Sequence, residues 1–555
     1  MGTMHTTLRS EMSGTTAGFV PFPAERAGAY RAAGYWEGLA LDTAILRSAA
    51  ARWPNRTAVL DQDTSLTYRE LDETVDRAAA GLIALGISRG DRMVLQLPNR
   101  CSFAVALFSL LRLGAIPIMC LPGHRIAELS HFVDVADAVG VIMADNAAGF
   151  DYRTMAGQLG QRHRRLRHLL VDGDPGPYTP WSQICAATGR VPERACETGE
   201  PALLLVSGGT TGAPKLIPRT HDDYVYNISA SARLCRLTPD DVYLVSLPAG
   251  HNFPLACPGL LGAMSVGATV VFGSDPSPEA AFGAITERRV TVTALVPALA
   301  RLWAQACEWE PQRPKTLRLL QVGGAKLSPE DAQHIRATLT PGLQQVFGMA
   351  EGLLCYTRLD DPPDLVCNTQ GRPLSEADEV RVVNDSEHDV TPGEEGELLV
   401  RGPYTLNGYF RAERDNARAF SPQGFYRTGD RVRQLAGGYV EVTGRVKDVI
   451  HRAGETVSAP ELEAHLLTHP AAWAVAVVPI PDDYLGEKIC AAVVFKSNPV
   501  EISEVNAHLD SRGVAAHSRP DLVVAMPRLP TTAVGKIDKQ AIVAQIVDQT
   551  QRATK

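Results

Sequence analysis

Glycine, serine and threonine residues gather in one short stretch of the chain that ends in a lysine. The apolar run Ala-Leu-Leu-Leu-Val at 202–206 leads directly into Ser-Gly-Gly-Thr-Thr-Gly-Ala-Pro-Lys at 207–215. Glycines let several backbone N–H groups turn towards one anion, and the hydroxyls and the lysine ammonium add further donors. The stretch predicts a buried strand followed by a polyphosphate loop. The candidate phosphate-binding residues are Ser207, Gly208, Gly209, Thr210, Thr211, Gly212 and Lys215.

The loop does not have the spacing of a P-loop NTPase. That motif places a serine or threonine directly after the lysine and opens a helix, whereas here Pro214 precedes the lysine and Leu216 follows it. A Gly/Ser/Thr loop is also a common form of ordinary turn. The phosphate assignment therefore depends on motifs elsewhere in the chain.

Length and composition indicate a multidomain enzyme. The chain has 555 residues, 45% of them hydrophobic and 21% charged, and its net charge of −8 argues against a general nucleic-acid binder. The one dense basic run, at 162–168, is interpreted as a solvated helix face. Ten scattered cysteines without a C-x-x-C pair predict reduced thiols in a cytoplasmic protein. The sequence also lacks a signal-peptide pattern and a continuous apolar run long enough for a membrane span.

Strand-like and helix-like segments alternate through most of the chain. Thr67-Tyr-Arg-Glu70 has the form of a capping box and precedes an amphipathic helix that stops at Gly86. A helix is also expected at 102–113. This alternation predicts largely parallel α/β layers. The expected strands lie at 92–97, 115–120, 140–144, 242–247, 269–272, 292–296 and 317–322.

The pattern of predicted strands and turns changes after about residue 380. Shorter strands with Gly and Pro turns, at 396–401 and 438–443, suggest a small β-rich subdomain. A compact α+β pattern follows, with strands at 474–478 and 490–495 and a helix at 502–512. We expect an α/β fold with a large N-terminal domain of layered subdomains, at 1–444, and a small mobile α+β domain at 445–555.

Five motifs then occur in a distinctive order. After the Ser207 loop come Phe-Gly-Met-Ala-Glu at 347–351, Tyr-Arg-Thr-Gly-Asp at 426–430, Gly-Arg-Val-Lys-Asp at 444–448 and Pro-Thr-Thr-Ala-Val-Gly-Lys at 530–536. With these motifs, the chain resembles the adenylate-forming superfamily of acyl-CoA synthetases, luciferases and peptide-synthetase adenylation domains, from about residue 30 to about residue 545.

The resemblance implies that a carboxylate attacks the α-phosphate of ATP to give an acyl-adenylate, and that a thiol then takes the acyl group. It assigns catalysis to Lys536, Glu351 and His251, with Glu351 holding Mg²⁺. It makes Lys447 a hinge and Gly454 part of the thiol-transfer face. The remaining nucleotide-binding residues that it implies are Gly323, Gly324, Ala325, Phe347, Gly348, Met349, Ala350, Asp430 and Arg445.

The segment His251-Asn252 to Gly259 is similar to that of the aryl-acid-activating enzymes of siderophore assembly. Amino-acid-activating relatives carry an aspartate at the position of Asn252, and a neutral amide cannot pair with an ammonium group. Cys257 and Leu354 match positions where salicylate enzymes are bulkier and less polar than dihydroxybenzoate enzymes, which tend to have Ser and Val. The resemblance therefore implies salicylate, because less room and the lack of a hydroxyl partner would penalise a 3-hydroxyl. The implied aryl-acid set is His251, Asn252, Phe253, Cys257, Gly324 and Leu354.

The amino-acid sequences at 20–24, 251–259 and 406–409 are most similar to those of the salicylate-activating members of the mycobactin pathway. The resemblance therefore implies a phosphopantetheinylated aryl carrier protein as the acyl acceptor. Three alternatives stay open: a 2,3-dihydroxybenzoate ligase, an aryl-CoA ligase that uses free coenzyme A, and a non-catalytic acyl-sensing protein. For the His251-Asn252 pair, a helix cap or a turn is the alternative to a binding role.

Overall fold

The structure is a computed structural model of the 555-residue chain. It describes residues 17–189, 191, 197–207, 214–446, 449–452, 455–482, 484–532 and 535–553. These residues form two compact units: the first holds those up to 207, 214–379 and 400–426, and the second holds 380–399 and those from 427 onward. The domain boundary expected at 444/445 stays a prediction.

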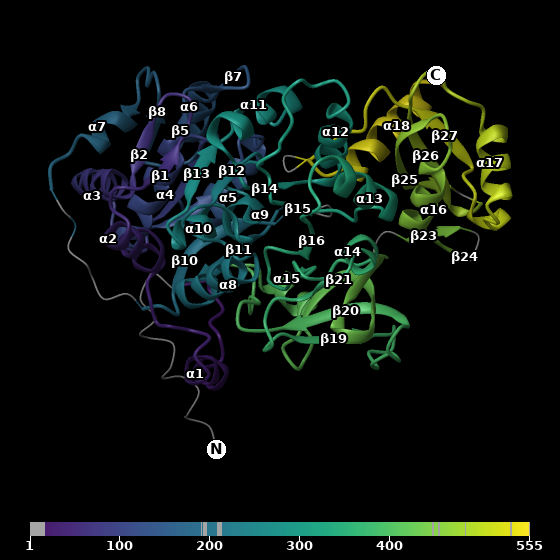
Figure 1. The fold of residues 1–555 in the computed structure, drawn as a ribbon, viewed down its shortest axis with the longest axis horizontal. Helices are drawn as coiled ribbons and strands as arrows, with labels where there is room; N and C mark the ends of the chain where they lie inside the picture. Colours follow the sequence, from purple (N-terminus) through teal and green to yellow (C-terminus); the bar gives the residue numbers. More distant parts are fainter. Residues whose placement is uncertain are drawn as a thin grey trace. The chain divides into compact units, whose positions relative to one another are not determined.

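A nine-stranded sheet forms the larger layer of the first unit (Figure 1). Its six inner strands pair in parallel, and antiparallel strands close both edges. This confirms the predicted parallel α/β layering. Its strands, in spatial order, are β18 (Arg372–Pro373), β17 (Leu354–Tyr356), β16 (Leu343–Gly348), β15 (Leu319–Gly323), β14 (Val292–Leu295), β12 (Val242–Val245), β13 (Thr269–Phe272), β1 (Thr57–Leu60) and β2 (Ser65–Thr67).

A seven-stranded sheet forms the second layer of this unit. Its strands pair in parallel except for the hairpin β10–β11 at one edge, which carries the candidate phosphate loop. The strand expected at 202–206 is confirmed as part of β10. In spatial order the strands are β11 (Leu216–Thr220), β10 (Pro201–Val206), β4 (Ile116–Met119), β3 (Arg92–Gln96), β5 (Gly140–Ala144), β8 (His168–Asp172) and β9 (Thr179–Pro180). A short ribbon, β6 (Asn146–Ala147) and β7 (Phe150–Asp151), stands apart.

Helices cover these sheets and bury their apolar sides. The capping box is confirmed, because the Thr67 hydroxyl accepts from Glu70 N–H while the Glu70 carboxylate accepts from Thr67 N–H. The helices of the first unit are α1 (Ala24–Ala32), α2 (Ser48–Arg52), α3 (Tyr68–Ala84), α4 (Cys101–Leu113), α5 (Ile126–Ala136), α6 (Tyr152–Arg162), α7 (Trp181–Cys185), α8 (His221–Leu234), α9 (Asn252–Ala256), α10 (Gly259–Ser265), α11 (Pro278–Arg288), α12 (Pro297–Ala306), α13 (Pro329–Thr338), α14 (Pro363–Asn368) and α15 (Glu413–Ala419).

The prediction that the basic run at 162–168 forms a helix face is wrong. Helix α6 ends at Arg162, and the run then passes through a turn into strand β8, which begins at His168. The charges are spread over a turn and a strand end, because His163 already has extended backbone angles at the helix C-cap.

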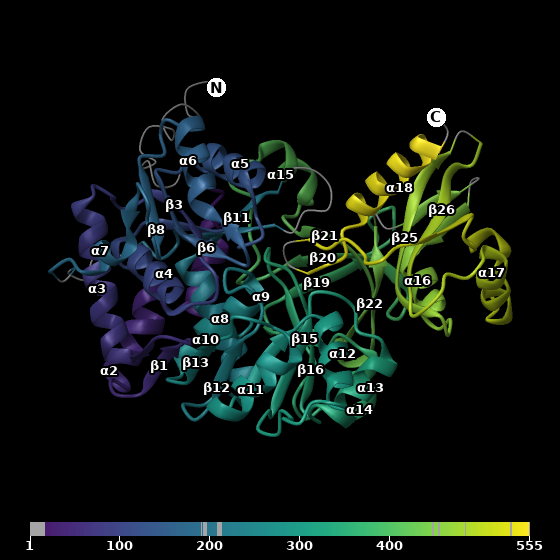
Figure 2. The same cartoon turned by 90° about the horizontal axis from the view of Figure 1, so that it is seen from above.

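The second unit contains two small sheets, as the shorter strand-like segments after residue 380 predicted. Residues alternate along β25 and β26, so that Val475 and Val477 pack with α16 and α17, whereas Ala476 and Val478 pack with α18 on the opposite face. Figure 2 shows α18 on one side of these strands and α17 on the other. The elements are β19 (Glu379–Val383), β20 (Glu395–Arg401), β21 (Tyr426–Gln434), β22 (Val440–Arg445), β23 (Val449–Arg452), β24 (Glu455–Ser458), α16 (Ala459–Leu467), β25 (Ala472–Asp482), β26 (Gly486–Phe495), α17 (Ile502–Ser511), β27 (Leu522–Ala525) and α18 (Lys539–Ala553).

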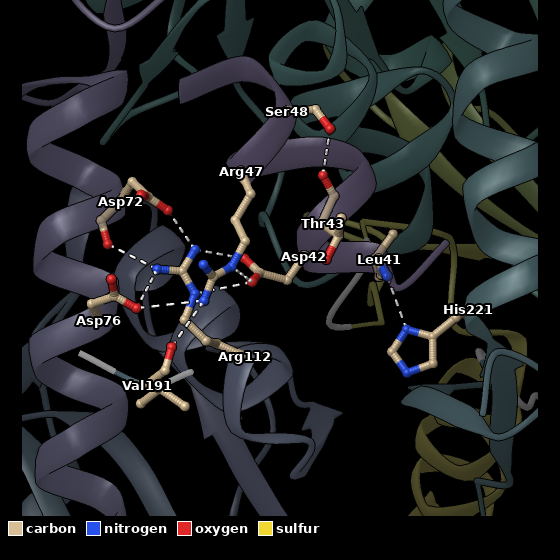
Figure 3. A network of polar contacts seen from close by, with 10 residues as sticks. All are labelled: Leu41, Asp42, Thr43, Arg47, Ser48, Asp72, Asp76, Arg112, Val191 and His221. Atoms are coloured by element: carbon tan, nitrogen blue, oxygen red, sulfur yellow. Dashed lines mark hydrogen bonds and ion pairs between the residues drawn. The ribbon is translucent and has the colours of Figure 1, made fainter. Parts of the chain in front are cut away.

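A buried ionic cluster ties three helical segments together (Figure 3). The Arg112 guanidinium on α4, 1% exposed, binds both carboxylate oxygens of Asp42 at 2.9 and 3.0 Å. It also reaches Asp72 at 2.6 Å and Asp76 at 3.0 Å, both on α3. Arg47, in a π-helical segment at Thr43–Arg47, adds a second cation 3.3 Å from Asp42. A buried charge is tolerated only when it is paired, and here the partners lie on different segments. The ion pairs therefore link α4 to α3 and to the π-helical segment.

Two further observations concern the chain as a whole. Every cysteine that the structure describes is a free thiol, as the cysteine spacing predicted. Among the helices of the described residues, none combines the length and the apolar character that crossing a bilayer needs.

Candidate functional site

The β10–β11 hairpin carries the predicted phosphate loop and is called the phosphate hairpin below. Two hydrogen bonds between the predicted residues Ser207 and Lys215 close it. Ser207 N–H donates to Lys215 O at 2.9 Å, and Lys215 N–H donates to the Ser207 hydroxyl at 2.8 Å. These bonds hold the two ends of the loop together at the end of β10–β11. Gly208, Gly209, Thr210, Thr211 and Gly212 lie outside the described residues.

The predicted adenine-binding glycines lie at the carboxyl ends of two adjacent parallel strands, β15 and β16. A Cβ at Gly323 would stand 2.6 Å from Val346 O and 3.1 Å from the Phe253 ring, and one at Gly348 would stand 2.5 Å from the Leu354 side chain. Side chains of the predicted aryl-acid set therefore pack directly on the predicted nucleotide strands. The carboxyl edge of a parallel sheet is where α/β folds bind ligands.

The other residues of this segment follow the same two strands. Gly324 has φ +89°, and Ala325 is exposed just beyond the end of β15. Phe347 belongs to β16, and Met349 and Ala350 begin the turn that leads to Glu351. The structure thus brings both predicted nucleotide segments to the carboxyl end of the same sheet.

Glu351 lies in a buried turn and is hydrogen-bonded by a tyrosine to which sequence reasoning assigned no role. The Tyr409 hydroxyl donates to Glu351 Oε1 at 3.0 Å, and burial together with this carboxylate raises the pKa of Tyr409. The Lys215 ammonium lies 5.4 Å from the centre of the Tyr409 ring and 3.6 Å from Asp415 on α15. Tyr409 therefore connects the phosphate hairpin to the predicted metal-binding carboxylate.

The donor set around Glu351 suits one particular kind of magnesium site. No cluster of three or more His, Cys, Asp or Glu side chains that could hold a metal occurs among the described residues. Mg²⁺ is commonly held by one or two carboxylates together with substrate phosphates and water. A single buried carboxylate near the phosphate hairpin fits that pattern.

In the predicted aryl-acid set Asn252, Phe253, Cys257 and Leu354 are buried, and the members within 251–257 hydrogen-bond to one another. Asn252 is 7% exposed and Cys257 is 1% exposed. The Asn252 amide Nδ2 donates to Cys257 Sγ at 3.5 Å, and the Cys257 thiol donates to Asn252 O at 3.5 Å. His251 is the N-cap of α9, where its Nδ1 accepts from Phe253 N–H at 3.3 Å. The alternative of a helix cap therefore holds for His251, and its catalytic role stays a prediction.

Sequence reasoning also missed a buried arginine, Arg219 on β11. Its guanidinium pairs with Asp223 at 2.8 Å and donates to Ala350 O at 3.1 Å and Tyr404 O at 3.2 Å. Arg219 thus ties the phosphate hairpin to the turn before Glu351. The available signal was an arginine in a strand whose other positions are apolar or small, and such a residue is buried only when it is paired.

A second buried network supports the strand that carries Leu354. Leu354 N–H donates to the Tyr404 hydroxyl at 3.1 Å, and that hydroxyl donates to Asp378 Oδ2 at 2.6 Å. Burial raises the pKa of Asp378 to about 7, although the hydrogen bonds from Tyr404 and Ser375 N–H oppose the shift. The folded protein therefore holds a proton on this carboxyl at pH values where the unfolded chain has released it.

We expect the contribution of Asp378 to the stability of the protein to fall as the pH rises from about 4 to about 7, because over this interval its carboxyl holds a proton in the folded state and has lost it in the unfolded state. Asp378→Asn removes this titration and should flatten that part of the stability curve, as measured by urea unfolding at pH 5 and pH 8. Asp360→Asn, at an exposed carboxylate, is the matched control. The same slope in Asp378→Asn and the wild type would contradict the assignment.

In the second unit the structure joins two predicted residues, Asp430 and Arg445. They face each other across the antiparallel pair β21–β22, and Arg445 Nε lies 3.0 Å from Asp430 Oδ1. Thr532 N–H donates to Lys536 O at 2.7 Å, and residues 533 and 534 between them lie outside the described residues. Lys447 and Gly454 lie outside the described residues, so the hinge and the thiol-transfer face stay predictions.

Comparison with known proteins identifies the family of the chain. Residues 46–410 match the family described as AMP-binding enzyme, and residues 461–536 match the AMP-binding enzyme C-terminal domain. The chain is 66% identical to the salicyl-AMP ligase / salicyl-S-ArCP synthetase of Mycobacterium tuberculosis, over 97% of this chain and 96% of that protein. It is 46% identical to the 2,3-dihydroxybenzoate-AMP ligase of Bacillus subtilis, over 95% of this chain and 97% of the relative.

Solved structures agree as well. The apo structure of MbtA from Mycobacterium smegmatis is 65% identical, with a TM-score of 0.77, and the match covers 96% of this chain and 100% of that one. The matched sequence families and these relatives agree with one another. The chain belongs to the AMP-binding enzyme family, within the adenylate-forming superfamily.

Proposed function

We propose that this protein activates salicylate with ATP and loads the salicyl group onto the phosphopantetheine thiol of an aryl carrier protein. In the first step a salicylate carboxylate oxygen bonds to the α-phosphorus of ATP, and the bond from that phosphorus to the bridging oxygen breaks, releasing pyrophosphate. In the second step the thiol sulfur bonds to the salicyl carbonyl carbon and AMP leaves.

The observation that carries the choice of an aryl acid is the set of hydrogen bonds of Asn252. Its buried amide bonds to neutral partners, the Tyr224 hydroxyl and the Cys257 thiol. An α-amino acid substrate needs an anionic partner for its ammonium group, and a neutral amide does not supply one. The 66% identity to a salicyl-AMP ligase supports salicylate among the aryl acids.

The chain's own residues suggest how the first step is assisted. Lys215, Ser207 and the rest of the phosphate loop would bind the departing pyrophosphate, and Lys536 would neutralise the attacking carboxylate and the charge that develops at phosphorus. Glu351, held by Tyr409, would hold Mg²⁺. Bound Mg²⁺ supplies charge neutralisation at the phosphates.

Salicylate-dependent ATP–pyrophosphate exchange tests the proposal. We expect strong exchange with salicylate, weaker exchange with 2,3-dihydroxybenzoate, and transfer of radiolabelled salicylate to a carrier protein. The absence of salicylate-dependent exchange would refute it. Transfer to free coenzyme A, without any transfer to a carrier protein, would favour an aryl-CoA ligase.

We expect the double variant Cys257→Ser, Leu354→Val to use 2,3-dihydroxybenzoate about tenfold better relative to salicylate. Both side chains are buried, and the changes add a hydroxyl partner and remove one methylene group from the pocket. The ratio of kcat/KM for the two acids measures the effect. Cys235→Ser, at another buried cysteine that binds Gln344, is the control, and an unchanged ratio in the double variant would count against these positions.

A further inference from the structure

One end of the Asn252 side-chain amide is hydrogen-bonded by a tyrosine that is fully buried. Tyr224, on α8, donates its hydroxyl hydrogen to Asn252 Oδ1 at 2.8 Å. The other end of the same amide, Nδ2, points towards Cys257 Sγ. The two ends of the amide therefore meet two different side chains.

The Cys257 thiol favours one of the two orientations that the amide could take. Its hydrogen is directed at Asn252 O, so its sulfur offers lone pairs to the amide side chain. A sulfur lone pair suits the N–H₂ end, and the phenol O–H suits the carbonyl end. In the flipped orientation the carbonyl oxygen would face the sulfur lone pairs, and a buried acceptor without a donor is costly.

Tyr224 itself has little freedom to move. The Arg219 guanidinium lies 4.6 Å from the centre of the Tyr224 ring, and Arg219 is fixed by Asp223, Ala350 O and Tyr404 O. Burial raises the pKa of Tyr224 well above its ordinary value, so the hydroxyl keeps the hydrogen that it donates. The donor that orients the amide is thus itself anchored by the strand that carries the phosphate hairpin.

We propose that Tyr224 is a positioning residue that turns the N–H₂ group of Asn252 towards the aryl acid, so that the pocket selects an ortho substituent able to accept a hydrogen bond. This inference rests on the proposed function. Tyr224 acts through Asn252 and contacts Asn252 rather than the substrate.

The selection follows from the chemistry of the ortho group. The phenol of salicylate can direct its hydrogen at its own carboxylate and keep its oxygen as an acceptor for Asn252. The amino nitrogen of 2-aminobenzoate shares its lone pair with the ring and presents N–H donors, which repel the amide N–H₂ group. Benzoate has no ortho group and is indifferent to the orientation of the amide.

The experiment is ATP–pyrophosphate exchange by the full-length wild type and Tyr224→Phe, with salicylate, 2-aminobenzoate and benzoate. In the variant we expect kcat/KM for salicylate to fall about tenfold or more, because the amide loses its orienting donor. The value for benzoate and the KM for ATP should change little, and the preference for salicylate over 2-aminobenzoate should shrink. A purely structural defect would instead lower the values for all three acids together.

Tyr226→Phe is the matched control on the same helix. Its hydroxyl donates to the Ser375 hydroxyl at 2.6 Å, so the variant loses a buried hydroxyl that does not touch Asn252. We expect it to keep the wild-type ratio of salicylate to benzoate. An unchanged ratio in Tyr224→Phe, or an equal fall in Tyr226→Phe, would overturn the inference.

The wild type gives a second test that needs no variant. Its kcat/KM should be at least about tenfold higher for salicylate than for 2-aminobenzoate. A buried N–H donor that is repelled or left unpaired lowers kcat/KM by about that factor. Equal use of the two acids would overturn the inference even if Tyr224→Phe failed to fold. A wild type without any salicylate-dependent exchange would instead refute the proposed function, so the two failures are distinguishable.

Discussion

Replacing Lys536 by alanine is expected to lower the rate of salicyl-AMP formation by about 10²–10³-fold or more. The side chain would place a cation against the attacking carboxylate and the charge that develops at the α-phosphorus. Removing that cation takes away stabilisation that the transition state needs more than the ground state does. Salicylate-dependent pyrophosphate exchange measures the loss, and calorimetric titration should show ATP binding largely intact.

Lys539→Ala is the matched control for this prediction. Lys539 lies three residues further along and pairs with Glu463 at 2.9 Å, so its loss removes a nearby ammonium group with a structural partner. We expect it to keep most of the exchange activity. Transfer of the salicyl group from preformed salicyl-AMP to the carrier protein should also survive in Lys536→Ala. Exchange at the wild-type rate in Lys536→Ala would refute the assignment.

The second large effect is expected from Glu351→Gln, which we predict to reduce pyrophosphate exchange by about 10²-fold and to shift the Mg²⁺ requirement to higher concentration. The amide keeps the size of the side chain and can still accept from the Tyr409 hydroxyl. It loses the negative charge that Mg²⁺ prefers. A titration of exchange activity with MgCl₂ at saturating ATP and salicylate separates the loss of rate from the shift in the Mg²⁺ requirement.

Glu379→Gln is the control, since this carboxylate pairs with Arg401 on the surface of the protein. It should leave the Mg²⁺ titration unchanged. If Glu351→Gln showed the wild-type Mg²⁺ dependence, the metal-binding assignment would be wrong, whatever its overall rate. Some residual exchange at high Mg²⁺ is expected, because the phosphates of ATP supply the other ligands.

Local patterns were sufficient to predict most elements of the fold. The strands buried in a parallel sheet are short apolar runs, and such runs predicted β3, β5, β13 and β14 within about a residue at most ends. The Thr67–Glu70 capping box was predictable because both partners lie within one turn of the chain. The prediction of a helix face for the basic run at 162–168 is wrong, because charge alone does not distinguish a helix face from a turn that enters a strand.

Long-range contacts could not be predicted in this way. Arg219 meets Ala350 and Tyr404 across more than a hundred residues of chain, and no local pattern encodes that meeting. The same holds for the hydrogen bond from Tyr409 to Glu351, because Tyr409 belongs to a segment that showed sequence similarity but suggested no role. These contacts depend on strand order and register, which are set by packing of the whole sheet.

The sequence by itself determined the alternation of strands and helices, the order of the five motifs and the types of side chain available for nucleotide and aryl-acid binding. Those properties are carried by residue type and short spacing. Only the tertiary structure decided that Phe253 packs on Gly323, that Leu354 packs on Gly348, and that Tyr224 orients Asn252. The physical reason is that parallel strands bring their carboxyl ends to one edge, so residues distant in the chain become neighbours only once the sheet has formed.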